Sequence, residues 1–180
     1  FNKRMDNKAV DKLFIGLMVI IMGISLYNVR RTESFMLKLC SALIRSAAST
    51  PAEYRETVES MLAGTHFSFD MERFSEHDEV VVLDAAPDEN DLRSLFILPD
   101  KIAAKTGEPV FVIIGEFQNL LELGEKTSEL IFRIMLENMA GKSAENASYS
   151  SYILSGSKVN AMKFIFEDRK YFHRHMEHIP

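Results

Sequence analysis

The feature that most constrains the fold is a run of five apolar residues, VFVII at positions 110–114. The run is short, rich in β-branched side chains and preceded by a Gly-Glu-Pro turn signal, which favours a strand over a helix. Because no polar residue interrupts it, we expect both faces of this strand to be buried. Gly115 and Glu116 then follow at its carboxyl end, where ligands bind in open α/β sheets. The alternative is a core strand followed by a solvated Glu116.

Strand patterns and helix patterns alternate along the rest of the chain. Further short apolar segments predict strands at residues 18–26, 79–85 and 151–157. Apolar residues at helical spacing predict helices around residues 35–44 and 92–98, and over residues 125–140 and 158–172. This alternation predicts the α/β fold class. A chain of 180 residues suits one domain with a substantial core, which we assign to residues 1–180.

Charge and cysteine content exclude several classes of protein. The net charge of −5 gives no basic footprint for nucleic acid. The single cysteine, Cys40, excludes an internal disulfide and fits a reducing compartment, so we expect a cytoplasmic protein. Because Cys40 lies in an apolar helical pattern, we interpret it as a buried and inert thiol.

The longest apolar run, residues 13–27, leaves two interpretations open. A buried strand over residues 18–26 is preferred, because the run is shorter than the roughly 20 residues of a membrane helix and contains two glycines. An uncleaved membrane anchor is the alternative, since basic residues precede the run. On the preferred interpretation no membrane partner is expected.

The segment after this first strand has the context of a phosphate-binding loop. It reads LYNVRRTESFM over residues 26–36, so a strand is followed by a turn and then a helix. The side chains that would face phosphates are Asn28, Arg30, Arg31, Thr32 and Ser34. The alternative is a plain turn between strand and helix with exposed arginines.

Four motifs together carry a resemblance to a known family. They are EFQ at residues 116–118, LPDKIA at 98–103, ILSGS at 153–157 and FEDRKYF at 166–172. In this combination the chain resembles the archaeal-type P-loop ATPase family of the AAA+/STAND group. The resemblance implies a three-layer parallel sheet with helices on both faces. The family continues into a helical lid and a winged-helix segment, and we expect both to be absent because the chain stops soon after residue 157.

The resemblance also implies roles for individual residues. Glu116 would polarise the attacking water, and Ser155 or Ser157 would contact the γ-phosphate. ATP and Mg²⁺ are the implied cofactors. Gly115 stands where the family has the Asp that holds Mg²⁺.

The sequence departs from the family at the two places that bind nucleotide. The loop at residues 26–36 lacks the Gly-Lys pair and is about two residues short of the family pattern, and Gly115 supplies no carboxylate. We therefore hypothesise an ATP-binding switch with weak or no hydrolysis. The alternative is a pseudo-ATPase scaffold that acts through contacts with a protein partner.

No metal site is predicted from the residues. His66 and His77 are isolated in the sequence and are expected to be hydrogen-bonded or at the surface. His173, His175 and His178 lie close together near the end of the chain, but no second ligand cluster accompanies them.

Overall fold

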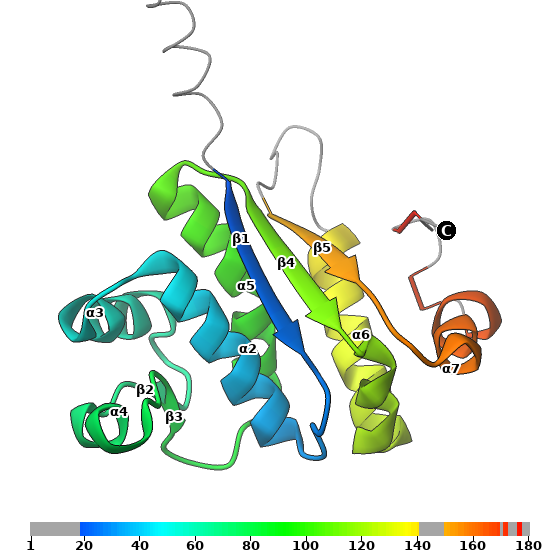
Figure 1. Cartoon of the computed structure of the whole chain (residues 1–180), viewed down its shortest axis with the longest axis horizontal. Helices are drawn as coiled ribbons and strands as arrows, with labels where there is room; N and C mark the ends of the chain where they lie inside the picture. The colour runs from blue at the N-terminus through cyan, green and yellow to red at the C-terminus, as the bar shows by residue number, and fades with distance from the viewer. Residues whose placement is uncertain (1–18, 141–149, 170, 173–175, 178–180) are drawn as a thin grey trace, which may run out of the picture.

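The computed structural model describes residues 19–140, 150–169, 171–172 and 176–177. In chain order the elements are β1 (Ile20–Ser25), α2 (Thr32–Ala47), α3 (Pro51–Met61), β2 (Phe67–Ser68), α4 (Met71–His77), β3 (Val82–Leu83), α5 (Glu89–Thr106), β4 (Val110–Gly115), η1 (Phe117–Leu123), α6 (Glu125–Ala140), β5 (Ser150–Leu154), α7 (Val159–Lys163) and η2 (Phe164–Asp168). The segment η1 is a 3₁₀ helix and η2 is a π-helical turn. Strands and helices alternate as the α/β class requires (Figure 1).

The main sheet has three parallel strands in the order β1-β4-β5. The predicted strand at residues 110–114 is its middle strand, β4. In the register Ile20 pairs with Val110, which pairs with Ser150 on its other side. A parallel sheet flanked by helices confirms the α/β prediction. Since all three strands run in one direction, their carboxyl ends meet at the same edge of the sheet.

Helices pack against one face of this sheet. Helix α2 contacts β1, and helix α5 contacts both β4 and β5. Figure 1 shows α5 and α6 on the far side of the strands. The ring of Tyr152 on β5 lies 6.3 Å from the ring of Phe96 on α5, centroid to centroid. The strand side chains on this inner face are buried or half-buried: Ile20, Met22, Ile24, Val110, Val112, Ile114, Ser150, Tyr152 and Leu154.

The prediction that both faces of β4 are buried is wrong for the described part of the chain. Phe111 and Ile113 on the other face are only half-buried. Their neighbours Ile21 and Ile153 are exposed. Among the described residues the helices cover one face, so this part of the chain forms two layers of the expected three. An apolar run shows that neither face carries polar side chains, but the covering layer depends on residues far away in sequence.

The segment at residues 79–85 does not join the main sheet. Only Val82–Leu83 forms a strand, β3, which pairs antiparallel with β2 in a separate two-stranded sheet. Val80 and Val81 are buried in the hydrophobic core next to it. The apolar character of the segment therefore reflects core packing more than strand formation.

The membrane-anchor alternative for residues 13–27 is contradicted at residues 20–25. Residues 20–25 form β1 and pair with β4 along the whole strand. Within the described ranges, no helix combines the length and hydrophobicity that crossing a bilayer requires. Residues 13–18 lie outside the described part.

A buried carboxylate fixes the start of α5. The Asp91 N–H donates to Asp88 Oδ1 at 3.0 Å, and the Asp88 N–H donates to Asp91 Oδ2 at 2.8 Å, which forms a capping box. Asp91 also accepts the His66 backbone N–H at 2.7 Å and pairs with His66 Nδ1 at 2.8 Å. Asp91 is fully buried, so it ties the segment before β2 to α5.

This cluster makes the stability depend on pH. Burial raises the pKa of Asp91, but the hydrogen bonds from His66 and Asp88 outweigh burial and hold that pKa below its ordinary value. The hydrogen bond with Asp91 raises the pKa of His66. The contribution of Asp91 is lost as the pH falls through its lowered pKa. The contribution of His66 is lost as the pH rises through its raised pKa.

We predict that Asp91→Ala lowers the free energy of unfolding by about 2–4 kcal/mol near pH 6, because backbone N–H groups and a protonated His66 lose a buried acceptor. The control Asp88→Ala removes an exposed N-cap and is expected to cost about 1 kcal/mol. Urea denaturation between about pH 5 and pH 8 measures both, spanning the ordinary His pKa. The effect of Asp91→Ala should shrink as the pH rises. Equal losses in both variants, or a loss that does not change with pH, would contradict this role.

Candidate functional site

The exits of the three parallel strands are held together at the carboxyl edge of the sheet. After β1, the Leu26 N–H donates to the Gly115 carbonyl at 2.8 Å. After β5, the Ser155 N–H donates to the Ile114 carbonyl at 3.0 Å. These bonds continue both ladders beyond the strands. The residues that follow β1, β4 and β5 therefore lie side by side, as the sequence predicted for this edge.

Glu116 is the first residue beyond β4 and lies at the centre of this edge. Its backbone is left-handed, with φ 55° and ψ 38°. A non-glycine residue in this region costs about 1–3 kcal/mol, which the surrounding structure must offset. Glu116 Oε2 accepts hydrogen bonds from Ser157 Oγ at 2.7 Å and from Gln118 Nε2 at 2.8 Å. The candidate residues Glu116 and Ser157 are thus in direct contact.

The contacts of Glu116 favour its ionised form. Hydrogen bonds from Ser157 and then Gln118 lower the pKa of Glu116, partial burial opposes them, and the charge of Lys158 adds to the lowering. Glu116 is therefore a carboxylate at neutral pH. A general base works best when its pKa is near the operating pH. A carboxylate stabilised in this way is poorly suited to take a proton from water, and it is better suited to hold a hydrogen-bond donor.

The connection between β1 and α2 is a closed turn. The Val29 N–H donates to the Leu26 carbonyl at 3.1 Å, and the Asn119 side chain donates to the same carbonyl at 3.2 Å. The Tyr27 N–H donates to Ser25 Oγ at 3.3 Å. Leu26 and Val29 are buried. A phosphate-binding loop directs its backbone N–H groups toward the ligand, whereas the Tyr27 and Val29 N–H groups of this turn bond within the protein.

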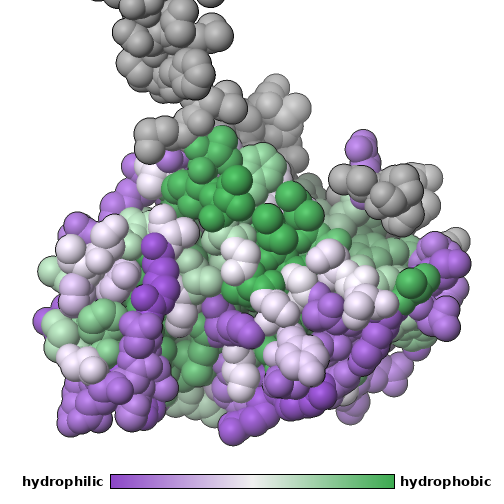
Figure 2. Space-filling model, in the orientation of Figure 1, coloured by the Kyte–Doolittle hydropathy of each residue, from purple (hydrophilic) through white to green (hydrophobic). Residues whose placement is uncertain are grey.

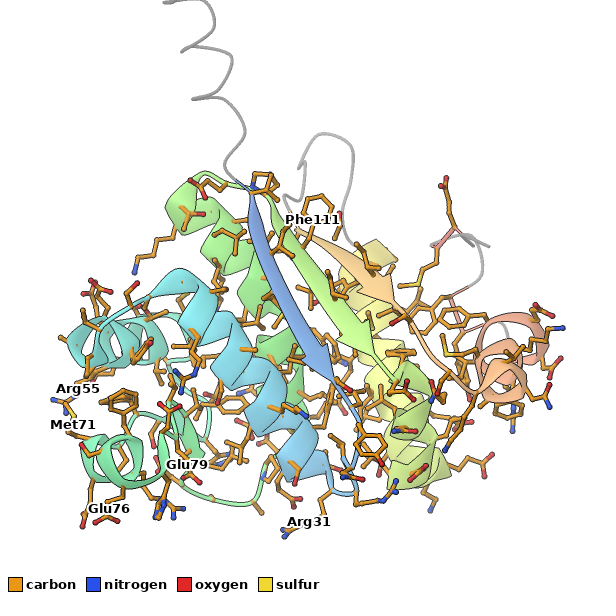
Figure 3. All side chains as sticks on the ribbon, in the orientation of Figure 1. Arg31, Arg55, Met71, Glu76, Glu79 and Phe111 are labelled. Atoms are coloured by element: carbon orange, nitrogen blue, oxygen red, sulfur yellow. The ribbon has the colours of Figure 1, made fainter. Side chains whose placement is uncertain are left out.

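Several candidate phosphate contacts surround this turn, and the basic ones are paired. Asn28 is exposed and left-handed, with φ 61°, and Thr32 and Ser34 lie in the first turn of α2. Arg30 forms an ion pair with Glu122. Arg31 Nε lies 3.3 Å from Glu33 Oε2 (Arg31 is labelled in Figure 3).

The edge as a whole has little net charge. Lys158 Nζ lies 3.1 Å from Glu122 Oε1, so Glu122 binds two cations at once. With Glu116 and Glu33, the carboxylates at this edge balance the nearby basic side chains. A polyanion such as a triphosphate gains little from such a surface, because each cation already has a carboxylate partner.

The residues present do not fit ATP and Mg²⁺ in the way the resemblance implies. The turn lacks the glycine and the lysine that hold phosphates in the family, two of its N–H groups bond within the protein, and Gly115 has no side chain to bind a metal. Packing does not force glycine at position 115, since the nearest atom to an added Cβ there is the Ile24 carbonyl at 3.6 Å. Ser155 Oγ lies 3.8 Å from the same Cβ position, which places Ser155 beside Gly115.

The sequence interpretation missed three residues of this edge. Gln118 and Asn119 are buried, and the structure gives Gln118 Oε1 and Asn119 Oδ1 no hydrogen-bond partner among the described residues. Gly156 is packed closely against its neighbours. A Cβ added at this position would collide with Gln118 Oε1 and would lie 2.6 Å from Met162 Sδ. The signal in the sequence was the glycine between Ser155 and Ser157, which marks a close approach.

Two other features among the described residues are a groove and a group of possible metal ligands. A groove of about 400 Å³ adjoins the start of α2. It is lined by the Arg31–Glu33 and Arg73–Glu79 ion pairs and by apolar residues, namely Leu37, Val81, Val82, Leu83, Ala85, Ala86 and Pro87.

His66, Asp88 and Asp91 bring one ligand atom each within 4.8 Å of one another. Helix capping already accounts for that group, because both oxygens of Asp91 accept hydrogen bonds. His173, His175 and His178 lie outside the described residues.

Comparison of the chain with family models, with curated proteins and with solved structures gives no match. The resemblance to P-loop ATPases therefore depends on the four sequence motifs alone and stays a prediction.

We predict that Gly156→Ala lowers the free energy of unfolding by about 1–3 kcal/mol, because the added methyl group meets Gln118 and Met162 in a packed site. The displaced Gln118 should also release Glu116, so the pKa of Glu116 rises toward its ordinary value. Chemical denaturation and NMR titration of the Glu116 carboxylate measure the two effects.

The matched control is Gly23→Ala. Gly23 lies in β1, and an added Cβ there meets nothing closer than Ile113 Cβ at 3.9 Å. We expect a change within about 0.5 kcal/mol of wild type. If both alanine variants are equally stable and the Glu116 pKa is unchanged in each, the close contact at Gly156 is not structurally important.

Proposed function

We propose that this chain is a P-loop ATPase-like domain that works without nucleotide, as a scaffold that acts through protein contacts. The observation that supports this most directly is the closed turn after β1. Val29 and Asn119 both bond to the Leu26 carbonyl, and this holds the turn in a form with no phosphate cradle.

The contacts of Glu116 support the same proposal. In an ATPase a carboxylate here would orient water toward a γ-phosphate. Glu116 instead holds Ser157, and through it the exit of β5. Its lowered pKa fits a permanently ionised group that stabilises the edge. In the proposed scaffold Glu116 and Ser157 keep the sheet edge rigid for a protein partner.

We predict no measurable binding of ATP or ADP in the presence of Mg²⁺. Calorimetry at millimolar nucleotide should give no heat beyond dilution, and the melting temperature should shift by less than about 1 °C, since only a ligand that binds the native state stabilises it. Binding with a micromolar dissociation constant corresponds to about −8 kcal/mol and would refute the proposal.

A repaired variant serves as the positive control for that measurement. It combines Gly115→Asp, for which the structure has room at Cβ, with a Gly-Lys insertion between Thr32 and Glu33. If the repaired variant binds Mg-ATP and the natural chain does not, the missing groups account for the difference. If the natural chain binds as tightly as the repaired variant, these groups are not required and the scaffold proposal fails.

The second candidate function is the ATP-binding switch with weak or no hydrolysis. The groove of about 400 Å³ beside Arg31 favours it, because a nucleotide base could lie there while Arg30, Thr32 and Ser34 face the phosphates. On this alternative Arg30→Ala weakens nucleotide binding, and Glu116→Gln abolishes any single-turnover hydrolysis. The scaffold proposal expects neither effect.

A further inference from the structure

One face of the main sheet is apolar and uncovered in the described part of the chain. Ile21 on β1 is 65% exposed and Ile153 on β5 is 45% exposed. Half-buried Phe111 and Ile113 lie between them on β4. The register places Ile21 opposite Phe111, and Ile113 opposite Ile153. These four side chains are the apolar face. Figure 2 shows hydrophobic surface over these strands, and Figure 3 labels Phe111 near the amino end of β4.

The position of the apolar face within the sheet limits which segment of the chain can cover it. The same face carries small residues at the carboxyl edge, Ser25, Gly115 and Ser155, and Ser151 lies opposite Phe111 at the amino end of β5. The apolar part therefore runs across the sheet from Ile21 and Phe111 to Ile113 and Ile153. The described chain enters β1 through Val19 at the amino end of the sheet. Exposed apolar patches on proteins mark interaction sites. Whatever precedes Val19 is therefore tethered at the border of the apolar face.

The sequence before Val19 has the pattern of a helix with one apolar side. Val10, Leu13, Phe14 and Leu17 recur at the i, i+3, i+4 and i+7 spacing. Lys8 and Lys12 fall on the opposite side of such a helix. Eight residues in a helix, the length of residues 10–17, span about 12 Å. The first and third strands of a sheet lie about 10 Å apart, so this length suffices to cross all three.

We propose that residues 10–17 dock as an amphipathic helix on the apolar face and complete the third layer of the fold. Val10, Leu13, Phe14 and Leu17 would pack on Ile21, Phe111, Ile113 and Ile153. Met18 and Val19 form the connection, and short helix-to-strand connections of two residues or more are common. The tether favours this occupant over a separate chain, because it raises the local concentration of the helix to the millimolar range.

Disulfide trapping tests the proposal on the full chain. Cys40 is the single cysteine of the sequence and is fully buried, and burial raises the pKa of its thiol, so it does not compete under mild oxidation. We combine Ile153→Cys with Phe14→Cys, and as the matched control Ile153→Cys with Lys12→Cys. A disulfide needs Cα atoms within about 7 Å, so only a cysteine on the docked side reacts readily.

The expected result is an intramolecular cross-link that forms at least about tenfold faster for Phe14→Cys than for Lys12→Cys. Equal rates would overturn the proposal. Cross-links between two chains would also overturn it, because they identify a second copy as the occupant.

A second measurement does not depend on the cysteine variants. Leu13→Asp with Phe14→Asp places charge on the docking side, whereas Lys8→Asp with Lys12→Asp places the same number of carboxylates on the other side. Only the first pair should uncover the apolar face and increase the fluorescence of a dye that binds exposed apolar surface, by about threefold or more. The same dye signal from both pairs would contradict the docking.

Discussion

The structure depends on the hydrogen bonds by which β4 holds the exits of its two neighbours. Carbonyl groups at the end of β4 accept the N–H of Leu26 on one side and of Ser155 on the other. The side chain of Asn119, in the 3₁₀ helix that follows, donates a further hydrogen bond to this edge, and its acceptor is the Leu26 carbonyl. The carboxyl edge is therefore a single hydrogen-bonded unit. It places Gly115, Glu116 and Ser155 side by side, and the turn after β1 cannot open without losing bonds to β4 and η1.

Within this unit, the residues that the sequence predicts to contact nucleotide are bonded to other groups of the protein. Glu116 and Ser157, which the resemblance assigns to water and the γ-phosphate, form a hydrogen bond with each other. Arg30 lies near the same edge, and Glu122 neutralises it. These bonds within the protein are the observations on which the scaffold proposal depends.

The sequence predicted the elements that local signals define. Strand β4 and helix α5 were predicted because an uninterrupted apolar run and apolar residues at helical spacing are both local patterns. Features that depend on distant partners were not predicted. Gly156 faces Gln118 across 38 positions of sequence, and β3 pairs with β2 instead of the main sheet. The burial of both faces of β4 was overestimated, because hydrophobicity does not identify the covering layer. The roles of Glu116, Ser155 and Ser157 stay predictions.

Amide hydrogen exchange at the turn after β1 tests the central claim most directly. The claim is that this turn is closed in the native protein and does not respond to nucleotide. We expect the Val29 amide to exchange slowly in the free protein, because it bonds to the Leu26 carbonyl. Its protection, and that of residues 28–34, should be the same with and without millimolar Mg-ATP. Fast exchange in the free protein that becomes slow on adding Mg-ATP would show a loop that closes on phosphate, and would contradict the account.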